Sequence, residues 1–246
     1  MQLVLSTFPG IGLLDAAFEA EGFCVVRGPD LLWGGDIKTF HPPAGRFDGI
    51  IGGSPCPAFS RLRHIVEANG YKTAENLIPE YERVVEEAAV DWFVHENAPD
   101  SPEPVVPGYA VSSFVLNNRH VGGAQDRKRR FSFGVRGGEP VQLRSFVELS
   151  ALEPAEYEHA VVSSSRAVPV ALLKGGKEKR TRKGDPRRSV GQMLQAQGFP
   201  PDLLDHAPFT ETAKRKVVSN GVPRYMGRAV ARAVREALAR SESLAA

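Results

Sequence analysis

Cys56 and Glu96 are the side chains whose setting in the sequence is best suited to chemistry. Each follows a short apolar run that predicts a buried strand, residues 49–52 before Cys56 and residues 92–94 before Glu96. The carboxyl ends of parallel strands meet at one edge of a sheet, where ligands bind, so we expect both side chains to face one cleft. A thiol there could be a nucleophile and a carboxyl group an acid or a base.

A thiol titrates near ~8.5 and needs positive surroundings to ionise at neutral pH. Arg127 and Arg129 could provide them if the fold brings them close. A structural thiol at position 56 is the alternative that the residues alone leave open. The other cysteine, Cys24, lies in an apolar stretch and is expected to be packed, as is His95 beside Glu96.

A glycine-containing turn, residues 8–12, follows the first predicted strand and opens a helix. Glycines in such a turn allow the backbone to approach a ligand, although a tight turn without a ligand explains the pattern as well. Asp30 and Asp36 follow the next strand, where carboxylates can accept hydrogen bonds from a ribose or an adenine amine. Exposed loop carboxylates without a ligand are the alternative.

The elements that would position these residues alternate between strands and helices. Strands are predicted at 3–5, 23–26, 49–52, 92–94 and 130–135, and helices at 13–18, 77–89 and 226–238. This alternation predicts an α/β fold with a mostly parallel sheet and helices on both faces. Residues 140–190 lack periodicity and predict a small irregular lobe.

Composition limits the possible classes of protein. The 246 residues suffice for one large domain with a small lobe, and no apolar run approaches the roughly 18 residues of a membrane span. Residues 1–6 read as a first strand rather than a signal peptide. Two distant cysteines exclude a disulfide framework and a zinc site, so we expect a cytoplasmic protein without a metal.

Positive charge is concentrated in residues 174–188, which carry a net charge of +6 although the whole chain carries +2. Such a segment suits a phosphate backbone, and a solvated loop is the alternative. Its basic residues are Lys174, Lys177, Lys179, Arg180, Arg182, Lys183, Arg187 and Arg188.

Seven short segments, taken together and in order, resemble the cytosine-specific (carbon 5) DNA methyltransferase family, its short phage and prophage members especially. They are Phe8 to Gly12, Gly35 to Ile37, Pro55-Cys56, Glu96-Asn97, Gln125 to Arg129, Gln197 to Pro200 and Asn220 to Pro223. The resemblance implies a Rossmann-like sheet that binds S-adenosylmethionine, formed by residues 1–139 and completed by 216–246. Residues 140–215 would form a small target-recognition lobe that contacts double-stranded DNA through the basic residues above, and its shortness suggests a short recognition site.

The resemblance also implies roles for single residues. Cys56 would attack cytosine carbon 6, Glu96 would bond to ring nitrogen 3, and Asn97 would hold the Glu96 loop. Arg127 and Arg129 would contact the base, a phosphate or Glu96. The expected cofactor-binding residues are Phe8, Pro9, Gly10, Gly12, Leu13, Asp30, Asp36, Ile37, Pro55, Asn220 and Gly221.

Pro57 departs from the family pattern, which has glutamine after the Pro-Cys pair, and it removes a backbone donor beside the thiol. A DNA-binding remnant with weak activity therefore stays open. The resemblance also leaves open a methyltransferase acting on tRNA, since one related group does that. A monomer in a bacterial cytoplasm is expected. The recognition sequence, and the choice between a restriction pair and protection of a phage genome, stay open.

Overall fold

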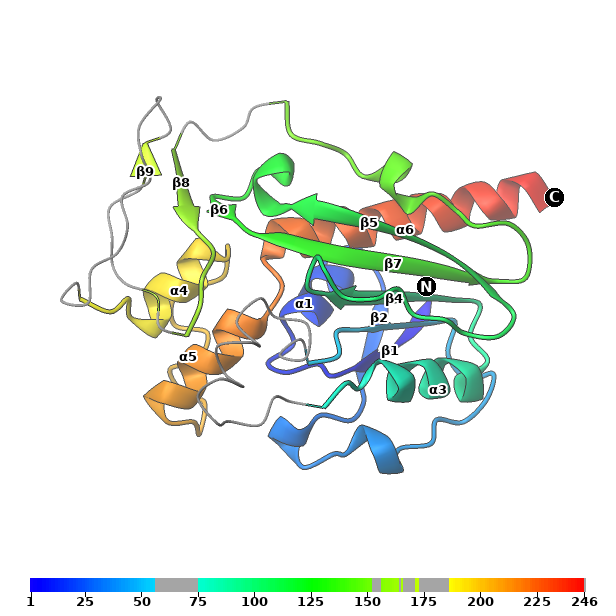
Figure 1. Cartoon of the computed structure of the whole chain (residues 1–246), viewed down its shortest axis with the longest axis horizontal. Coiled ribbons are helices and arrows are strands. Elements are labelled where there is room, and N and C mark those ends of the chain that lie inside the picture. Colours follow the sequence, from blue (N-terminus) through cyan, green and yellow to red (C-terminus); the bar gives the residue numbers. More distant parts are fainter. Residues whose placement is uncertain (56–74, 152–155, 164, 166–170, 173–185, 246) are drawn as a thin grey trace.

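The computed structural model describes residues 1–55, 75–151, 156–163, 165, 171–172 and 186–245. Within them, a mixed six-stranded sheet has the strand order β2-β1-β3-β4-β7-β5 (Figure 1). Its strands are β1 (Leu3–Thr7), β2 (Cys24–Arg27), β3 (Gly49–Gly52), β4 (Trp92–Asn97), β5 (Tyr109–Asn117) and β7 (Lys128–Arg136). Strands β2, β1, β3 and β4 are parallel, whereas β7 runs antiparallel to both β4 and β5.

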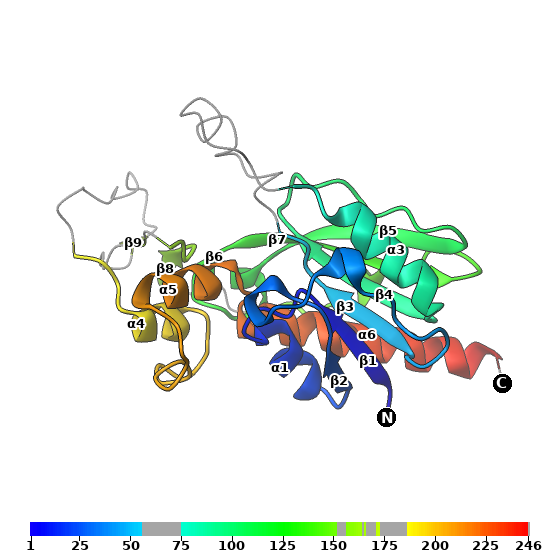
Figure 2. The ribbon, with the colours of Figure 1, turned by 90° about the horizontal axis from the view of Figure 1, so that it is seen from below.

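Helices cover both faces of this sheet, which confirms the predicted α/β fold (Figure 2). The α-helices are α1 (Leu13–Glu19), α3 (Ile78–Ala88), α4 (Val190–Ala196), α5 (Glu211–Asn220) and α6 (Arg224–Ala245). The 3-10 helices are η1 (Leu31–Trp33), η2 (Ile37–Thr39), η4 (Asn118–Val121) and η5 (Leu143–Phe146). In Figure 2, α1 and α6 lie on one face of the sheet and α3 lies on the other.

Each face of the sheet has its own hydrophobic core because neighbouring residues of a strand point to opposite faces. Val4 and Trp92 pack towards α1 and α6, together with Phe18 of α1. Leu5 and Phe93, one residue further along each strand, pack towards α3. Both cores hold the parallel strands rigidly, so the carboxyl ends of β1, β3 and β4 form a fixed platform.

The lobe next to the strand ends is built from α4, α5 and a small three-stranded sheet. That sheet contains β6 (Gln125–Asp126), β8 (Glu156–His159) and β9 (Ala171–Leu172). Met193 and Leu194 of α4 pack on Val218 of α5 and on Leu13, the first residue of α1. The lobe therefore shares part of its core with the start of α1.

Residues 140–215 were expected to form the lobe, but their first part packs on the main sheet instead. Leu143 and Val147 belong to the hydrophobic core beneath α6. Arg215 of α5, by contrast, donates hydrogen bonds to the carbonyl groups of Ser163, Ser165 and Arg188 and so ties the lobe's own segments together. The stretch that follows β7 thus packs on the sheet before the chain enters the lobe.

Two local expectations differ from the structure. β5 was not predicted, since its polar residues Ser112 and Ser113 interrupt the apolar pattern of a strand that pairs only with β7. The expectation that Cys24 is packed is wrong, because this cysteine is exposed. It begins β2, an edge strand in which Val25 contacts the core while its neighbours are exposed.

Candidate active site

A cavity of about 600 Å³ lies at the carboxyl ends of β1, β3 and β4. Its walls come from the turn after β1, from η1 and η2, from the residues after β3 and β4, and from α5 with the loop that follows it. The volume is in the range typical of small-molecule sites. Apart from Gly12, every residue expected to bind the cofactor lies on this wall.

The turn after β1 is held in an unusual conformation by contacts with the segment that follows β2. Phe8 has a positive φ of 53°, and its backbone N–H donates to the carbonyl of Pro29 over 3.1 Å. The N–H of Gly10 donates to the Asp30 carboxylate over 2.7 Å. The same carboxylate caps η1 by accepting from the N–H of Leu32. Asp30 therefore shapes the turn that it faces.

Gly12 is required by conformation rather than by contact with the cavity. Its φ is 78°, and the guanidinium group of Arg27 occupies the space that a side chain at position 12 would need. Arg27 is held there by an ion pair of 3.0 Å with Asp15, a buried residue of α1. Burial raises the pKa of Asp15, while its hydrogen bond with Ser6 and the charge of Arg27 oppose that rise.

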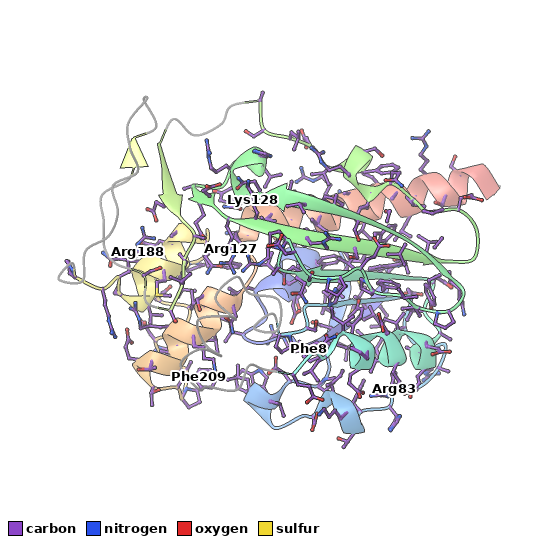
Figure 3. The ribbon with its side chains drawn as sticks, viewed as in Figure 1. Phe8, Arg83, Arg127, Lys128, Arg188 and Phe209 are labelled. Carbon is purple, nitrogen blue, oxygen red and sulfur yellow. The ribbon has the colours of Figure 1, made fainter. Side chains whose placement is uncertain are left out.

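Asp36 and Ile37 form the wall beside α3. The Asp36 carboxylate caps η2 by accepting from the N–H of Lys38 over 3.0 Å. Arg83 of α3 holds the same element by donating to the carbonyl groups of Ile37, over 2.7 Å, and Phe40, over 3.1 Å. Figure 3 shows Arg83 on α3. Sequence reasoning did not identify Arg83, since nothing in its pattern distinguishes it from a surface arginine.

Glu96 and Arg129 form a largely buried ion pair at the ends of β4 and β7. Arg129 Nε lies 2.8 Å from Glu96 Oε1, and both side chains line the cavity. Burial raises the pKa of the Glu96 carboxyl group, and the charges of Arg129 and Arg127 limit that rise. Gly53 leaves room for this carboxyl group, since a Cβ at position 53 would lie 2.7 Å from Glu96 Oε2.

Asn97 joins the end of β4 to the residues that follow β3. Its side-chain amide donates to the carbonyl of Ser54, over 3.2 Å, and to the Ser54 hydroxyl group, over 3.0 Å. That hydroxyl group also lies 3.0 Å from Nε2 of His95. His95 is buried, and burial lowers its pKa to about 3, so the ring is neutral at physiological pH. These bonds fix the two strand ends relative to each other.

Arg127 does not line the cavity, contrary to its expected contact with the base, a phosphate or Glu96. Its buried guanidinium group donates to the carbonyl of Val161 in the lobe and to those of Ser219, in the last turn of α5, and Gly221, which follows α5. Figure 3 shows Arg127 at the end of β7 that adjoins the lobe. Its charge still limits the rise in the pKa of Glu96.

The structure thus brings Glu96, Asn97 and Arg129 to one cavity together with the expected cofactor-binding residues. Pro55 is the last described residue before Cys56 and lies on the same wall. Cys56 and Pro57 lie outside the described residues. Lys216 of α5 and Ser54, neither of which was expected from the sequence, also line the cavity.

Most of the basic residues expected to bind DNA, from Lys174 to Lys183, lie outside the described residues. Arg187 is exposed. Arg188, labelled in Figure 3, corrects the expectation. It is buried and forms an ion pair of 2.6 Å with Glu158. A buried guanidinium group that is paired with a carboxylate is not available to a phosphate.

The described part of the chain contains no cluster of three or more histidine, cysteine or acidic side chains that could hold a metal ion. It also contains no helix with the length and apolar character needed to cross a membrane.

Comparison with known proteins gives a family match and curated relatives. The family described as C-5 cytosine-specific DNA methylase matches residues 34–100. The type II methyltransferase M.NgoPII of Neisseria gonorrhoeae is 28% identical over 185 residues, which cover 61% of this chain and 52% of that protein. The type II methyltransferase M.FnuDI of Fusobacterium nucleatum is 29% identical over 165 residues, which cover 54% of this chain and 46% of that protein.

The chain therefore spans about half the length of the curated relatives it matches. Among solved structures, the methyltransferase EhMeth of Entamoeba histolytica is similar over nearly the whole fold. The alignment has a TM-score of 0.60 at 10% identity and covers 98% of each chain. At that identity the likeness concerns the fold alone.

Proposed function

Because the chain belongs to the C-5 cytosine-specific DNA methylase family, we propose that it transfers a methyl group from S-adenosylmethionine to carbon 5 of cytosine in duplex DNA. One observation carries this proposal. The acidic residue Glu96, its partner Arg129 and the wall expected to hold the cofactor all line one cavity. Pro55, next to the proposed nucleophile Cys56, lines it as well.

The cavity fits a ligand with an adenosine part and an apolar linker. Its wall combines apolar side chains such as Phe8 and Leu13 with the carboxylates of Asp30 and Asp36. Asp36 accepts from one backbone N–H, which leaves further lone pairs for an amine or a hydroxyl group. When bound, S-adenosylmethionine supplies an electrophilic methyl group. Asp36 and Ile37 would hold its adenine, and Asn220 and Gly221 would close the opposite wall.

Cys56 and Glu96 would activate the cytosine ring together. The thiolate of Cys56 would add to carbon 6, which pushes electron density towards carbon 5 and ring nitrogen 3. The raised pKa of Glu96 supports a role as the acid that bonds to nitrogen 3. Arg129 would orient this carboxyl group through their ion pair. After methylation, loss of the proton from carbon 5 would release the thiolate.

Duplex DNA is the proposed substrate, and the target cytosine must leave the helix to reach a cavity at the strand ends. The basic residues of the 140–215 lobe are proposed to neutralise phosphates, with the exception of Arg188. Reading of base edges by the same lobe is proposed from its position beside the strand ends (Figure 1).

The test compares transfer of a labelled methyl group to duplex DNA and to tRNA, with Cys56→Ser as the central variant. We expect label in DNA only, and none with Cys56→Ser. Covalent trapping on DNA that contains 5-fluorocytosine should also disappear in this variant. Cys24→Ser is the matched control, since Cys24 is an exposed thiol on the edge strand β2 and should leave transfer and trapping unchanged.

Other results would replace the proposal. Label in tRNA alone would identify an RNA substrate. DNA binding without any methyl transfer would identify a binding remnant, for which Pro57 offers a reason. Trapping that survives Cys56→Ser would mean that another residue is the nucleophile.

A further inference from the structure

One face of α5 is directed at the cavity. Ala213, Lys216, Val217 and Asn220 all line it. Their spacing of three, four and seven residues places them on the same side of a helix. Three of these side chains are neutral, so Lys216 is the source of charge on this wall.

Lys216 differs from the other cation on the cavity wall. Arg129 is already paired with Glu96. The ammonium group of Lys216 has no ion pair and no hydrogen bond with any residue that the structure describes. Two residues earlier, Lys214 lies off the cavity wall and reaches the carbonyl of Asp205 over 3.4 Å.

The carboxylates of the cavity wall have other partners. Asp15 is paired with Arg27, and Asp30 accepts from two backbone N–H groups. Lys216 is exposed to solvent and lines a ligand-sized cavity. A few charged groups at set positions orient a ligand in a largely apolar pocket. The wall of α5 therefore suits an anionic group.

We propose that Lys216 binds the carboxylate of the methionine part of S-adenosylmethionine and so selects the amino-acid end of that ligand. This inference rests on the proposed function. The carboxylate is the negatively charged group of the ligand and lies at the end remote from adenine. The wall of α5 and the segment 31–39, which contains Asp36, approach the strand ends from different sides (Figure 1).

The test removes the positive charge of Lys216 or the carboxylate of the ligand. Calorimetric titrations of the full chain without DNA would use S-adenosylmethionine and decarboxylated S-adenosylmethionine, which lacks only the carboxylate. Lys216→Met keeps the length and helix preference of the side chain. Lys216→Arg keeps the charge, and Lys214→Met is the matched control on the same helix.

We expect Lys216→Met to weaken binding of S-adenosylmethionine roughly tenfold, as for loss of one charge-assisted hydrogen bond. For the decarboxylated ligand, Lys216→Met should change the affinity less than about twofold. This ligand already lacks the carboxylate, so the substitution has no interaction left to remove. Lys216→Arg should restore most of the affinity, and Lys214→Met should bind both ligands like the parent chain.

Three outcomes would overturn the inference. Equal weakening of both ligands by Lys216→Met would show a structural effect on α5. Unchanged binding of both ligands, with weaker DNA binding, would assign Lys216 to a phosphate instead. If the parent chain binds no S-adenosylmethionine and transfers no methyl group, the proposed function itself fails, and that result is distinct from the first two.

Discussion

At the scale of single residues, the Glu96–Arg129 pair shows what the sequence could and could not predict. The end of a buried strand indicated Glu96, and the Gln-x-Arg-x-Arg segment indicated its partner. The division of roles between Arg127 and Arg129 could not be predicted. Arg127 lies between β6 and β7, where strand alternation does not hold, and it contacts carbonyl groups 34 and 92 residues away.

Glu96→Gln tests whether a proton from this carboxyl group is needed. Glutamine keeps the shape but supplies no proton, and general acid catalysis contributes on the order of 10²-fold or more. We expect the single-turnover rate of methyl transfer to fall by about that factor, while the affinity for S-adenosylmethionine stays within a few fold. Glu86→Gln, at an exposed position of α3, is the control and should keep the parent rate.

The pH dependence of the same variant has a definite sign. Because burial raises the pKa of Glu96, the protonated form persists to higher pH than for an ordinary carboxyl group. The rate should decline on the alkaline side of that raised pKa, and this decline should be absent in Glu96→Gln. A rate profile with the same alkaline decline in both proteins would assign the titration to another group.

At the scale of elements, the order of most core strands and helices was predictable because each carries its own apolar period, whereas β5 was not predicted. The contacts between the lobe and the turn after β1 were not predictable either, since they join segments remote in sequence. Trp33 at the end of η1 packs against Phe209 of the lobe, with ring centroids 5.3 Å apart and the rings tilted by 55°. Its indole N–H donates to the carbonyl of Gly10 over 2.7 Å. This contact joins the lobe to the turn after β1.

A double-mutant cycle measures this contact between η1 and the lobe. Trp33→Ala, Phe209→Ala and the double variant would be unfolded in urea, and the coupling free energy should be about 0.5–1 kcal/mol, as expected for a partly exposed aromatic pair. Trp33→Phe should retain the coupling to Phe209 and lose only the bond to Gly10, at a cost of about 1 kcal/mol. A coupling near zero would mean that the rings touch without holding η1.

At the scale of the whole molecule, the lobe and the sheet are joined through buried polar side chains as well as apolar ones. Gln125 donates to the carbonyl of Ala196 and accepts from the N–H of Val161. Arg127 reaches both the lobe, at Val161, and the end of α5, at Ser219 and Gly221. Gly221 also lines the cavity. Residues 125–127 therefore join the lobe, the cavity wall and the sheet.

Arg127→Met should accordingly weaken the whole fold more than an ordinary arginine substitution does. It leaves three carbonyl groups without their charged donor, and we expect the free energy of unfolding in urea to fall by about 3 kcal/mol. Arg130→Met is the matched control, because Arg130 also follows β6 but donates to the single carbonyl of Pro99 over 3.1 Å, for an expected loss of roughly 1 kcal/mol. Equal losses in the two variants would contradict a special role for Arg127, and the lobe would then be held mainly by the apolar contacts of α4 and α5.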